Sequence, residues 1–214
     1  TPHLPEWPGA GDAEGVTLRR LLSHSAGIGV PGFIGYGVGD TLPTLAQMLA
    51  GELPANSPPV EQVAPAGEAF RYSGGGYLLV QALMEAVTGE AFADVMRSHV
   101  FAPLGMARSH YAPLDPALED RAASGHDENG QPLPGGEPIH AESAAGGLWS
   151  TPADLARLMI DLMRAYGGAE DALLSPELVQ AMLTPGFWNF GFGVRVLGAG
   201  ENLRFNHGGA TRGW

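Results

Sequence analysis

The 214-residue sequence contains no cysteine and no lysine, and all eleven of its basic side chains are arginines. Without cysteine the chain forms no disulfide and offers no thiolate nucleophile. Without lysine, a reaction that needs a lysine amine must obtain it from outside these residues. No apolar run approaches the roughly 20 residues of a membrane span. The formal net charge of −12 argues against nucleic acid or an anionic membrane as a partner.

The composition is that of a globular protein, because 44% of the residues are hydrophobic and only 16% are charged. The length suits one domain, which we take to span 1–214. The sequence begins at Thr1 without an initiator methionine or signal sequence and stops at Trp214. We therefore expect a piece of a longer protein, incomplete at both ends, whose compartment and subunit number stay open.

The stretch around which the chain is organised is Tyr72, followed by Ser73 and three glycines. Ser73 is a favourable N-cap, the residues after it are compatible with a helix, and Gly89 is a typical stop. The predicted helix is apolar almost all round, so we expect it to be buried. Its open amide groups would then face a cleft lined by Tyr72. A Gly-rich turn before a core helix is the alternative interpretation.

Caps and apolar spacing predict five further helices, and the helix that begins after Thr151 carries an apolar stripe that we expect to be core. Residues 1–15 have the composition of an extended lead-in. Residues 109–144 are expected to form long loops, with one short hairpin at Asn129-Gly130. The five helices are expected at 16–24, 43–50, 91–100, 152–166 and 175–183.

Near the end of the chain the apolar period changes to two. Apolar and polar or small residues alternate over 192–196 and again over 203–207, with a Gly-rich turn at 198–200. This pattern predicts a β-hairpin. The predicted fold class is therefore α+β, with a mainly helical lobe over 16–186 and sheet strands over 187–214.

Five segments, in this order and spacing, resemble the serine β-lactamase and penicillin-binding-protein superfamily, and in particular its class C-like β-lactamases and family VIII esterases. The resemblance covers essentially the whole chain and implies a β-lactamase/transpeptidase-like fold, incomplete here, whose final strands return to the active-site edge. It implies a small-molecule acyl substrate and no cofactor, and it is compatible with a periplasmic, secreted or cytoplasmic protein. The segments are VTLRRLLSHSAG at 16–27, YSGGGYLLVQALMEAVTG at 72–89, PLGM at 103–106, GGLWSTPADLAR at 146–157 and HGG at 207–209.

In that superfamily three elements meet in one cleft: a Ser-x-x-Lys at a helix start, a Tyr-x-Asn loop, and a Lys-Thr-Gly or His-x-Gly on a sheet-edge strand. By resemblance, Tyr72 is the catalytic tyrosine of the second element. The first element is missing, because the chain has no lysine, and we infer that it lies upstream of this chain. The substrate-binding residues implied by the resemblance are Ser73, Gly74, His207, Gly208 and Gly209.

The resemblance assigns Tyr72 to proton transfer between the nucleophilic serine and the substrate. A phenol with a pKa near 10 acts as a base only when nearby positive charge lowers that pKa, and the family's lysines supply this charge. We therefore expect residues 1–214 alone to have no hydrolase activity. The competing interpretation is a binding or regulatory protein that keeps the fold without the chemistry.

Two departures from the family pattern concern the substrate. Gly74 stands where asparagine is usual, so a side-chain hydrogen bond to a substrate amide is lost. His207 replaces a lysine, and histidine is mostly neutral near pH 7, which weakens the fixed cation that holds a β-lactam carboxylate. Both changes predict a preference for small esters over amides and β-lactam-like compounds. Arg212, a few residues further on, is the one candidate to replace that cation.

The other candidate sites have ordinary explanations. The Ser23-His24-Ser25 sequence invites a nucleophile interpretation, but adjacent helical residues do not face each other and no Gly-x-Ser-x-Gly is present. The histidines lack metal-ligand spacing, so we predict no metal site. The acidic turn at 127–130 lacks the calcium-loop pattern. The sequence does not decide whether Trp149 lines the active-site cleft or only packs against neighbouring side chains.

Overall fold

The computed structural model describes residues 7–10, 13, 15–111, 122–133 and 138–213. Parts of the expected lead-in at 1–15 and of the expected loops at 109–144 lie outside these residues. Within the described residues the chain forms short helices and two antiparallel pairs of strands, β1 with β2 and β3 with β4. No helix of this part is long and apolar enough to cross a membrane. The α+β fold class predicted from the sequence is confirmed.

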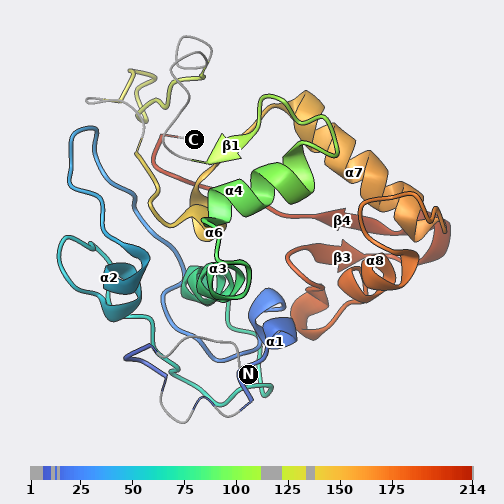
Figure 1. Cartoon of the computed structure of the whole chain (residues 1–214), viewed down its shortest axis with the longest axis horizontal. Coiled ribbons are helices and arrows are strands. Elements are labelled where there is room, and N and C mark those ends of the chain that lie inside the picture. Colours follow the sequence, from blue (N-terminus) through green and yellow to red (C-terminus); the bar gives the residue numbers. More distant parts are fainter. Residues whose placement is uncertain (1–6, 11–12, 14, 112–121, 134–137, 214) are drawn as a thin grey trace.

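Helix α3 (Gly74–Thr88) lies at the centre of the molecule (Figure 1). The Ser73 hydroxyl accepts a hydrogen bond from the Gly76 amide at 2.8 Å, and the helix ends at Gly89, whose positive φ of 72° suits glycine. The predicted helix is therefore confirmed. Its burial is only partly as expected, because the N-terminal half is buried while Val87 is 63% exposed.

The first core packs around the buried half of α3. Helix α1 (Leu18–Leu22) is capped by Thr17, and helix α2 (Leu45–Ala50) has a capping box between Thr44 and Gln47. Apolar side chains from these helices and the loops beside them bury one another. The fully buried members of this cluster include Val16, Leu21, Ile28, Met48, Val60, Leu78 and Leu79.

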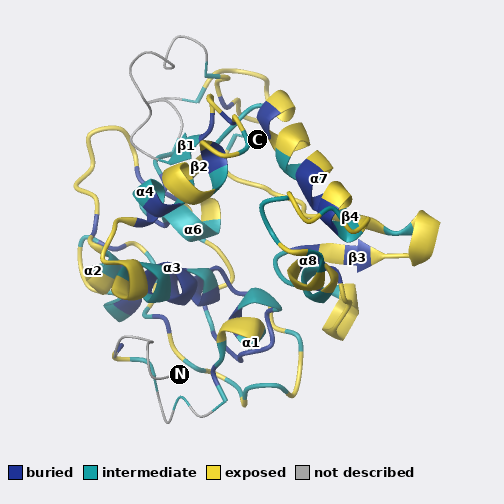
Figure 2. Ribbon diagram, turned by 45° about the vertical axis from the view of Figure 1, so that its right-hand side comes forward, coloured by how far each residue is buried: buried dark blue, intermediate teal, exposed yellow. Residues whose placement is uncertain are grey.

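A second core joins α7 (Pro152–Tyr166), α8 (Pro176–Met182) and the hairpin of β3 (Arg195–Leu197) and β4 (Arg204–Asn206). The predicted hairpin is present, with Val196 paired to Phe205, but its strands are shorter than the alternation over 192–196 and 203–207 suggested. The stripe on α7 was expected to be core throughout, and this is wrong in part. Leu162 is buried, but Met163 is 62% exposed, because only one side of α7 contacts α8 and the hairpin (Figure 2).

Several short elements connect the two cores. Helix α4 (Phe92–Met96) continues into a π-helical turn (Arg97–Phe101), and α6 (Ser143–Gly146) packs against α3. Strand β1 (His110–Tyr111) pairs with β2 (Leu148–Trp149). Two 3-10 turns, Phe187–Asn189 and Gly200–Asn202, flank β3. The sequence did not predict β1, β2 or α6, because two to four residues show no usable period.

The turn predicted at Asn129-Gly130 is present. The Asp127 amide donates to the Gln131 carbonyl at 2.8 Å, and His126 and Pro132 form an isolated antiparallel bridge. The Leu133 amide also donates to the Gly125 carbonyl at 3.0 Å, so the turn closes the short hairpin that the sequence predicted. Its position at the surface gives it no part in the site described below.

Candidate functional site

The two cores meet at the N-terminus of α3, where residues distant in sequence converge. Tyr72 directly precedes the N-cap of α3, and His207 directly follows β4. The Tyr72 hydroxyl lies 3.4 Å from Nε2 of His207, across 135 residues of sequence. The structure thus brings together the tyrosine and the histidine that the resemblance assigned to separate elements of one cleft.

The imidazole of His24 lies beneath this pair. Its ring centroid is 4.3 Å from that of Tyr72, at an interplanar angle of 36°, and 5.3 Å from that of Tyr77. Nδ1 of His24 accepts a hydrogen bond from the Ser73 amide at 3.1 Å. His24 is only 3% exposed, whereas Tyr72 is 42% exposed and open to a ligand. Phe190 closes the cluster, with its ring centroid 5.4 Å from that of His24.

Burial controls the ionisation of this cluster. It disfavours the charged form of His24 and, with the nearby His207, lowers the pKa of His24 from 6.5 to about 4. Burial also raises the pKa of Tyr72 above its ordinary value of 10. At neutral pH, His24 is therefore a neutral imidazole with an acceptor at Nδ1. Tyr72 is a protonated phenol, a hydrogen-bond donor and not yet a base.

Ser73 and Gly74 directly follow Tyr72 at the mouth of α3, but they differ in the atoms that they offer to a ligand. The Ser73 hydroxyl donates to the Gly29 carbonyl and accepts from Gly76, and the residue is 3% exposed, so this hydroxyl is committed to the fold. At Gly74 an added Cβ would lie 3.0 Å from Cε2 of Phe33. The Phe33 ring thus borders the space that a longer side chain at 74 would need.

A pocket of about 220 Å³ opens beside Tyr72. Its wall combines the mouth of α3, two residues of α6 and the end of β4. Gly208 and Gly209 are exposed, and an added Cβ at either would meet no described atom within 4 Å, so a ligand has room to approach this backbone. The pocket is lined by His24, Tyr72, Ser73, Gly74, Tyr77, Ala144, Ala145, Gly193 and His207.

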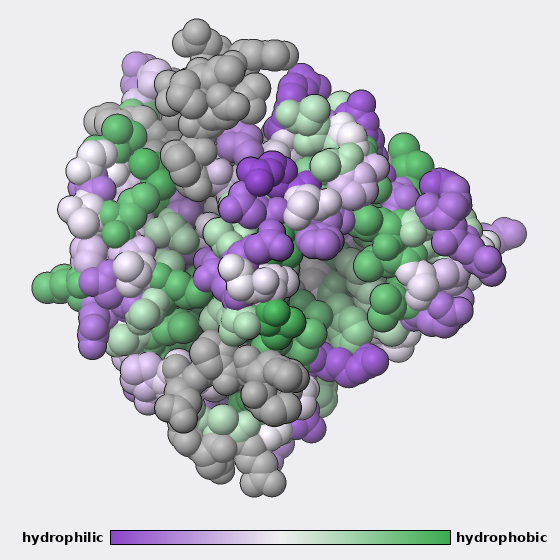
Figure 3. Space-filling view, viewed as in Figure 1, coloured by the Kyte–Doolittle hydropathy of each residue, from purple (hydrophilic) through white to green (hydrophobic). Residues whose placement is uncertain are grey.

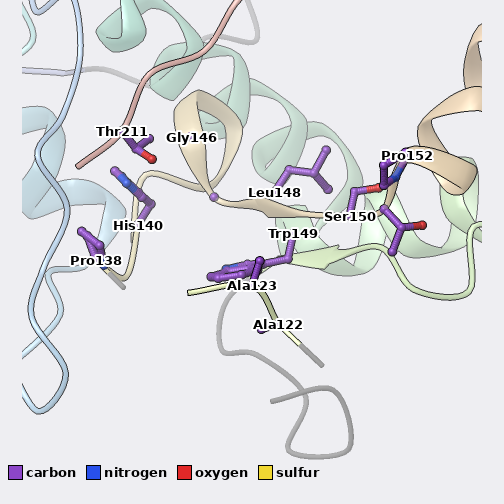
Figure 4. A pocket seen from close by; sticks show the side chains of 12 residues that line it. Ala122, Ala123, Pro138, His140, Gly146, Leu148, Trp149, Ser150, Pro152 and Thr211 are labelled. Atoms are coloured by element: carbon purple, nitrogen blue, oxygen red, sulfur yellow. The ribbon is translucent and has the colours of Figure 1, made fainter. Parts of the chain in front are cut away.

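A larger pocket of about 490 Å³ lies on the other side of α6 (Figure 4). Trp149, Leu148 and Pro138 give it apolar walls, and His140 and Thr211 lie close together at one end of it. Trp149 therefore lines this larger pocket and not the pocket beside Tyr72. On this face of the molecule, apolar surface gathers between the α3 side and the β3 and β4 side (Figure 3).

Sequence reasoning missed one neighbour of Tyr72, His24, and one neighbour of Gly74, Phe33. His24 was considered only as part of a Ser-His pair, and in the structure Ser23 and Ser25 instead bond to each other at 2.9 Å between their hydroxyls. Phe33 lies in a glycine-rich loop without periodicity, and no sequence signal distinguished it. Among the described residues no cluster of three metal-binding side chains is present. Asp127 accepts hydrogen bonds from the Asn129 and Gln131 amides, as a solvated turn does.

The helical core and the C-terminal hairpin form the fold of the β-lactamase and penicillin-binding-protein class of serine hydrolases, as the resemblance implied. The family comparison agrees: the Beta-lactamase family model matches residues 1–214, and the chain belongs to this family.

Individual relatives are more distant. Penicillin-binding protein 4 of Amycolatopsis lactamdurans is 33% identical over 114 residues, which cover 53% of this chain and 28% of that protein. D-aminopeptidase of Brucella anthropi is 29% identical over 152 residues, 69% of this chain and 28% of that protein. The crystal structure of D-amino acid amidase of Ochrobactrum anthropi with L-phenylalanine superimposes with a TM-score of 0.70. The match covers 95% of this chain and 58% of that chain at 22% sequence identity, so it shows a shared fold only. The aligned residues thus cover less than a third of either curated relative's length.

Proposed function

We propose that the complete protein containing this chain is a serine hydrolase that cleaves small acyl compounds through an acyl-enzyme. The observation that carries the proposal is the 3.4 Å approach of Tyr72 to His207 beside an open pocket. Tyr72 precedes α3 of the first core and His207 follows β4 of the second, so a proton-transfer group and a substrate-binding edge lie side by side. Membership of the Beta-lactamase family supports the same chemistry.

The reaction needs a nucleophile, and residues 1–214 contain no Ser-x-x-Lys motif because they contain no lysine. We propose that a Ser-x-x-Lys segment elsewhere in the protein supplies the nucleophilic serine. The serine oxygen attacks the substrate carbonyl while its proton passes to the Tyr72 oxygen. The leaving group then departs with that proton, and water hydrolyses the ester bond to the serine. Tyr72 can accept a proton only when its pKa is lowered, which the lysine cation of Ser-x-x-Lys would do.

Two residues of this chain bear on the substrate. Gly74 provides no side-chain amide for a substrate peptide group, and His207 replaces a permanent cation. We therefore propose that small esters are preferred over β-lactams, with amides such as those named for the aminopeptidase and amidase relatives as a second class. The test compares the catalytic efficiency for a p-nitrophenyl ester with that for a cephalosporin. Equal or higher efficiency on the cephalosporin contradicts the preference, and Arg212→Ala then tests whether Arg212 supplies the cation.

Fluorophosphonate labelling of the complete protein, followed by peptide mass spectrometry, tests the proposal as a whole. We expect labelling at a serine within Ser-x-x-Lys, outside residues 1–214. We expect no turnover by residues 1–214 alone, because the chain lacks any lysine. A folded complete protein that takes up no label would instead favour a non-catalytic binding protein, with Tyr72 and His207 as parts of a ligand site.

A further inference from the structure

His24 holds the backbone on both sides of Tyr72. Its carbonyl oxygen accepts from the Arg71 amide at 2.7 Å, and its Nδ1 accepts from the Ser73 amide at 3.1 Å. Its ring also lies against the Tyr72 ring, with centroids 4.3 Å apart. One residue therefore fixes the backbone at Arg71, the peptide that follows Tyr72, and the plane of the Tyr72 side chain.

These contacts come with unfavourable features. His24 adopts a left-handed backbone conformation, with φ at 53°, which costs a non-glycine residue free energy. Its Nε2 is buried and has no hydrogen-bond partner among the described residues, another cost. An apolar ring could pack against Tyr77 and Phe190 without a buried polar nitrogen. Strained and unsatisfied groups concentrate at functional sites, where surrounding structure imposes them.

We propose that His24 is a positioning residue for Tyr72, in which a neutral imidazole sets the place and orientation of the phenol opposite His207. The inference rests on the proposed hydrolase function, because it assigns His24 to the step in which Tyr72 transfers the proton. His24 makes no contact with substrate in this role. It acts through the Ser73 amide bond to Nδ1 and through the stacked ring.

The electrostatic surroundings keep this arrangement intact at neutral pH. Nδ1 accepts a hydrogen bond only while it carries no proton, and protonation would place a donor against the Ser73 amide. The titratable groups that face His24 are Tyr72, Tyr77 and His207. Burial and the charge of His207 lower the pKa of His24 to about 4, so the acceptor persists through the neutral range.

Two variants of the complete protein separate the two contacts. In His24→Asn the side-chain oxygen can replace Nδ1 as acceptor, and asparagine tolerates the left-handed backbone, but the stacked ring is lost. In His24→Phe the ring remains and the acceptor is lost. Misplacement of a catalytic group by about 1 Å costs up to a hundredfold in rate, so we expect His24→Phe to lower kcat by roughly ten- to a hundredfold with KM within about threefold. We expect His24→Asn to recover part of this loss.

A second readout does not depend on activity. Fluorotyrosine is incorporated, and the Tyr72 signal in the fluorine NMR spectrum is identified by its absence in Tyr72→Phe. We expect this signal to shift or broaden in both variants, in His24→Phe because the Ser73 amide loses its acceptor and in His24→Asn because the stacked ring is removed. His99→Asn, at an exposed histidine, is the matched control and should change neither kcat nor the signal.

An unchanged kcat and an unchanged Tyr72 signal in both His24 variants would overturn the inference. Lower melting temperatures together with an unchanged Tyr72 signal would also overturn it, because they indicate packing alone. If the wild-type complete protein neither turns over an ester nor takes up a fluorophosphonate, the proposed function fails. The fluorine signal then still decides whether His24 positions Tyr72.

Discussion

Asp154 offers the sharpest stability prediction, because its carboxylate is 1% exposed and bonded on both oxygens. Oδ2 accepts from the Arg108 amide at 2.8 Å and from the Ser109 hydroxyl at 3.0 Å. Oδ1 accepts from the Arg157 guanidinium at 2.7 Å. These bonds tie the N-terminus of α7 to the segment that enters β1, next to the Ser150 wall of the larger pocket.

Replacing Asp154 by alanine leaves the Arg108 amide without its acceptor, whereas the Ser109 hydroxyl can still donate to the Ser150 hydroxyl, 2.8 Å away. Each unsatisfied buried donor costs about 1 to 3 kcal/mol. The Arg157 side chain is half exposed, so losing its pairing adds little. We therefore expect Asp154→Ala to lower the free energy of unfolding by about 1 to 3 kcal/mol, mainly because the Arg108 amide loses its acceptor. Asp154→Asn keeps one acceptor oxygen and should cost less.

Urea unfolding of the complete protein, followed by circular dichroism, measures this difference from the shift in midpoint at constant slope. The matched control is Asp171→Asn. The Asp171 carboxylate pairs with Arg164 at 2.6 Å but is 76% exposed, so its loss should change the midpoint little. If Asp154→Ala unfolds within about 0.5 kcal/mol of wild type, the range for ordinary surface substitutions, the burial argument is wrong.

Three further predictions concern the site. First, burial lowers the pKa of His24 to about 4 in the folded state, against 6.5 in the unfolded state, so the unfolded state binds more protons between these two pH values. The free energy of unfolding should therefore fall by about 3 kcal/mol as the pH drops from 6.5 to 4. Unfolding measured over this pH range should show a shallower fall in His24→Asn. Second, Gly74→Asn should strain the Phe33 ring 3.0 Å away, and Phe33→Ala should relieve it, giving a favourable coupling energy of about 1 kcal/mol or more in a double-mutant cycle. Third, Tyr72→Phe should lower kcat of the complete protein at least a hundredfold by removing the proton carrier, with the melting temperature nearly unchanged because Tyr72 is 42% exposed.

Each of these has a contrary result. An equal acid dependence in wild type and His24→Asn would show that other groups, such as the buried Asp154, account for the loss of stability. Additive effects of Gly74→Asn and Phe33→Ala would mean that the ring moves aside freely. Full ester turnover by Tyr72→Phe would remove Tyr72 from the proton-transfer step.

The sequence by itself determined the local elements that carry strong signals. Ser73 and Gly89 bound α3, Thr151 and Pro152 open α7, and the period of two placed the hairpin of β3 and β4. Caps and apolar periods act over a few neighbouring residues, so they can be read without knowing the fold. The order of the motifs also indicated the family, which the family comparison confirms.

Only the tertiary structure decided which residues surround Tyr72. His207 reaches it across 135 residues, and His24 lies beneath it because the chain after α1 turns back under the mouth of α3. It also decided that Met163 on α7 faces away from the second core and that Phe33 lies against Gly74. A local pattern tells which face of a helix is apolar, but which neighbour covers that face depends on how distant segments pack together.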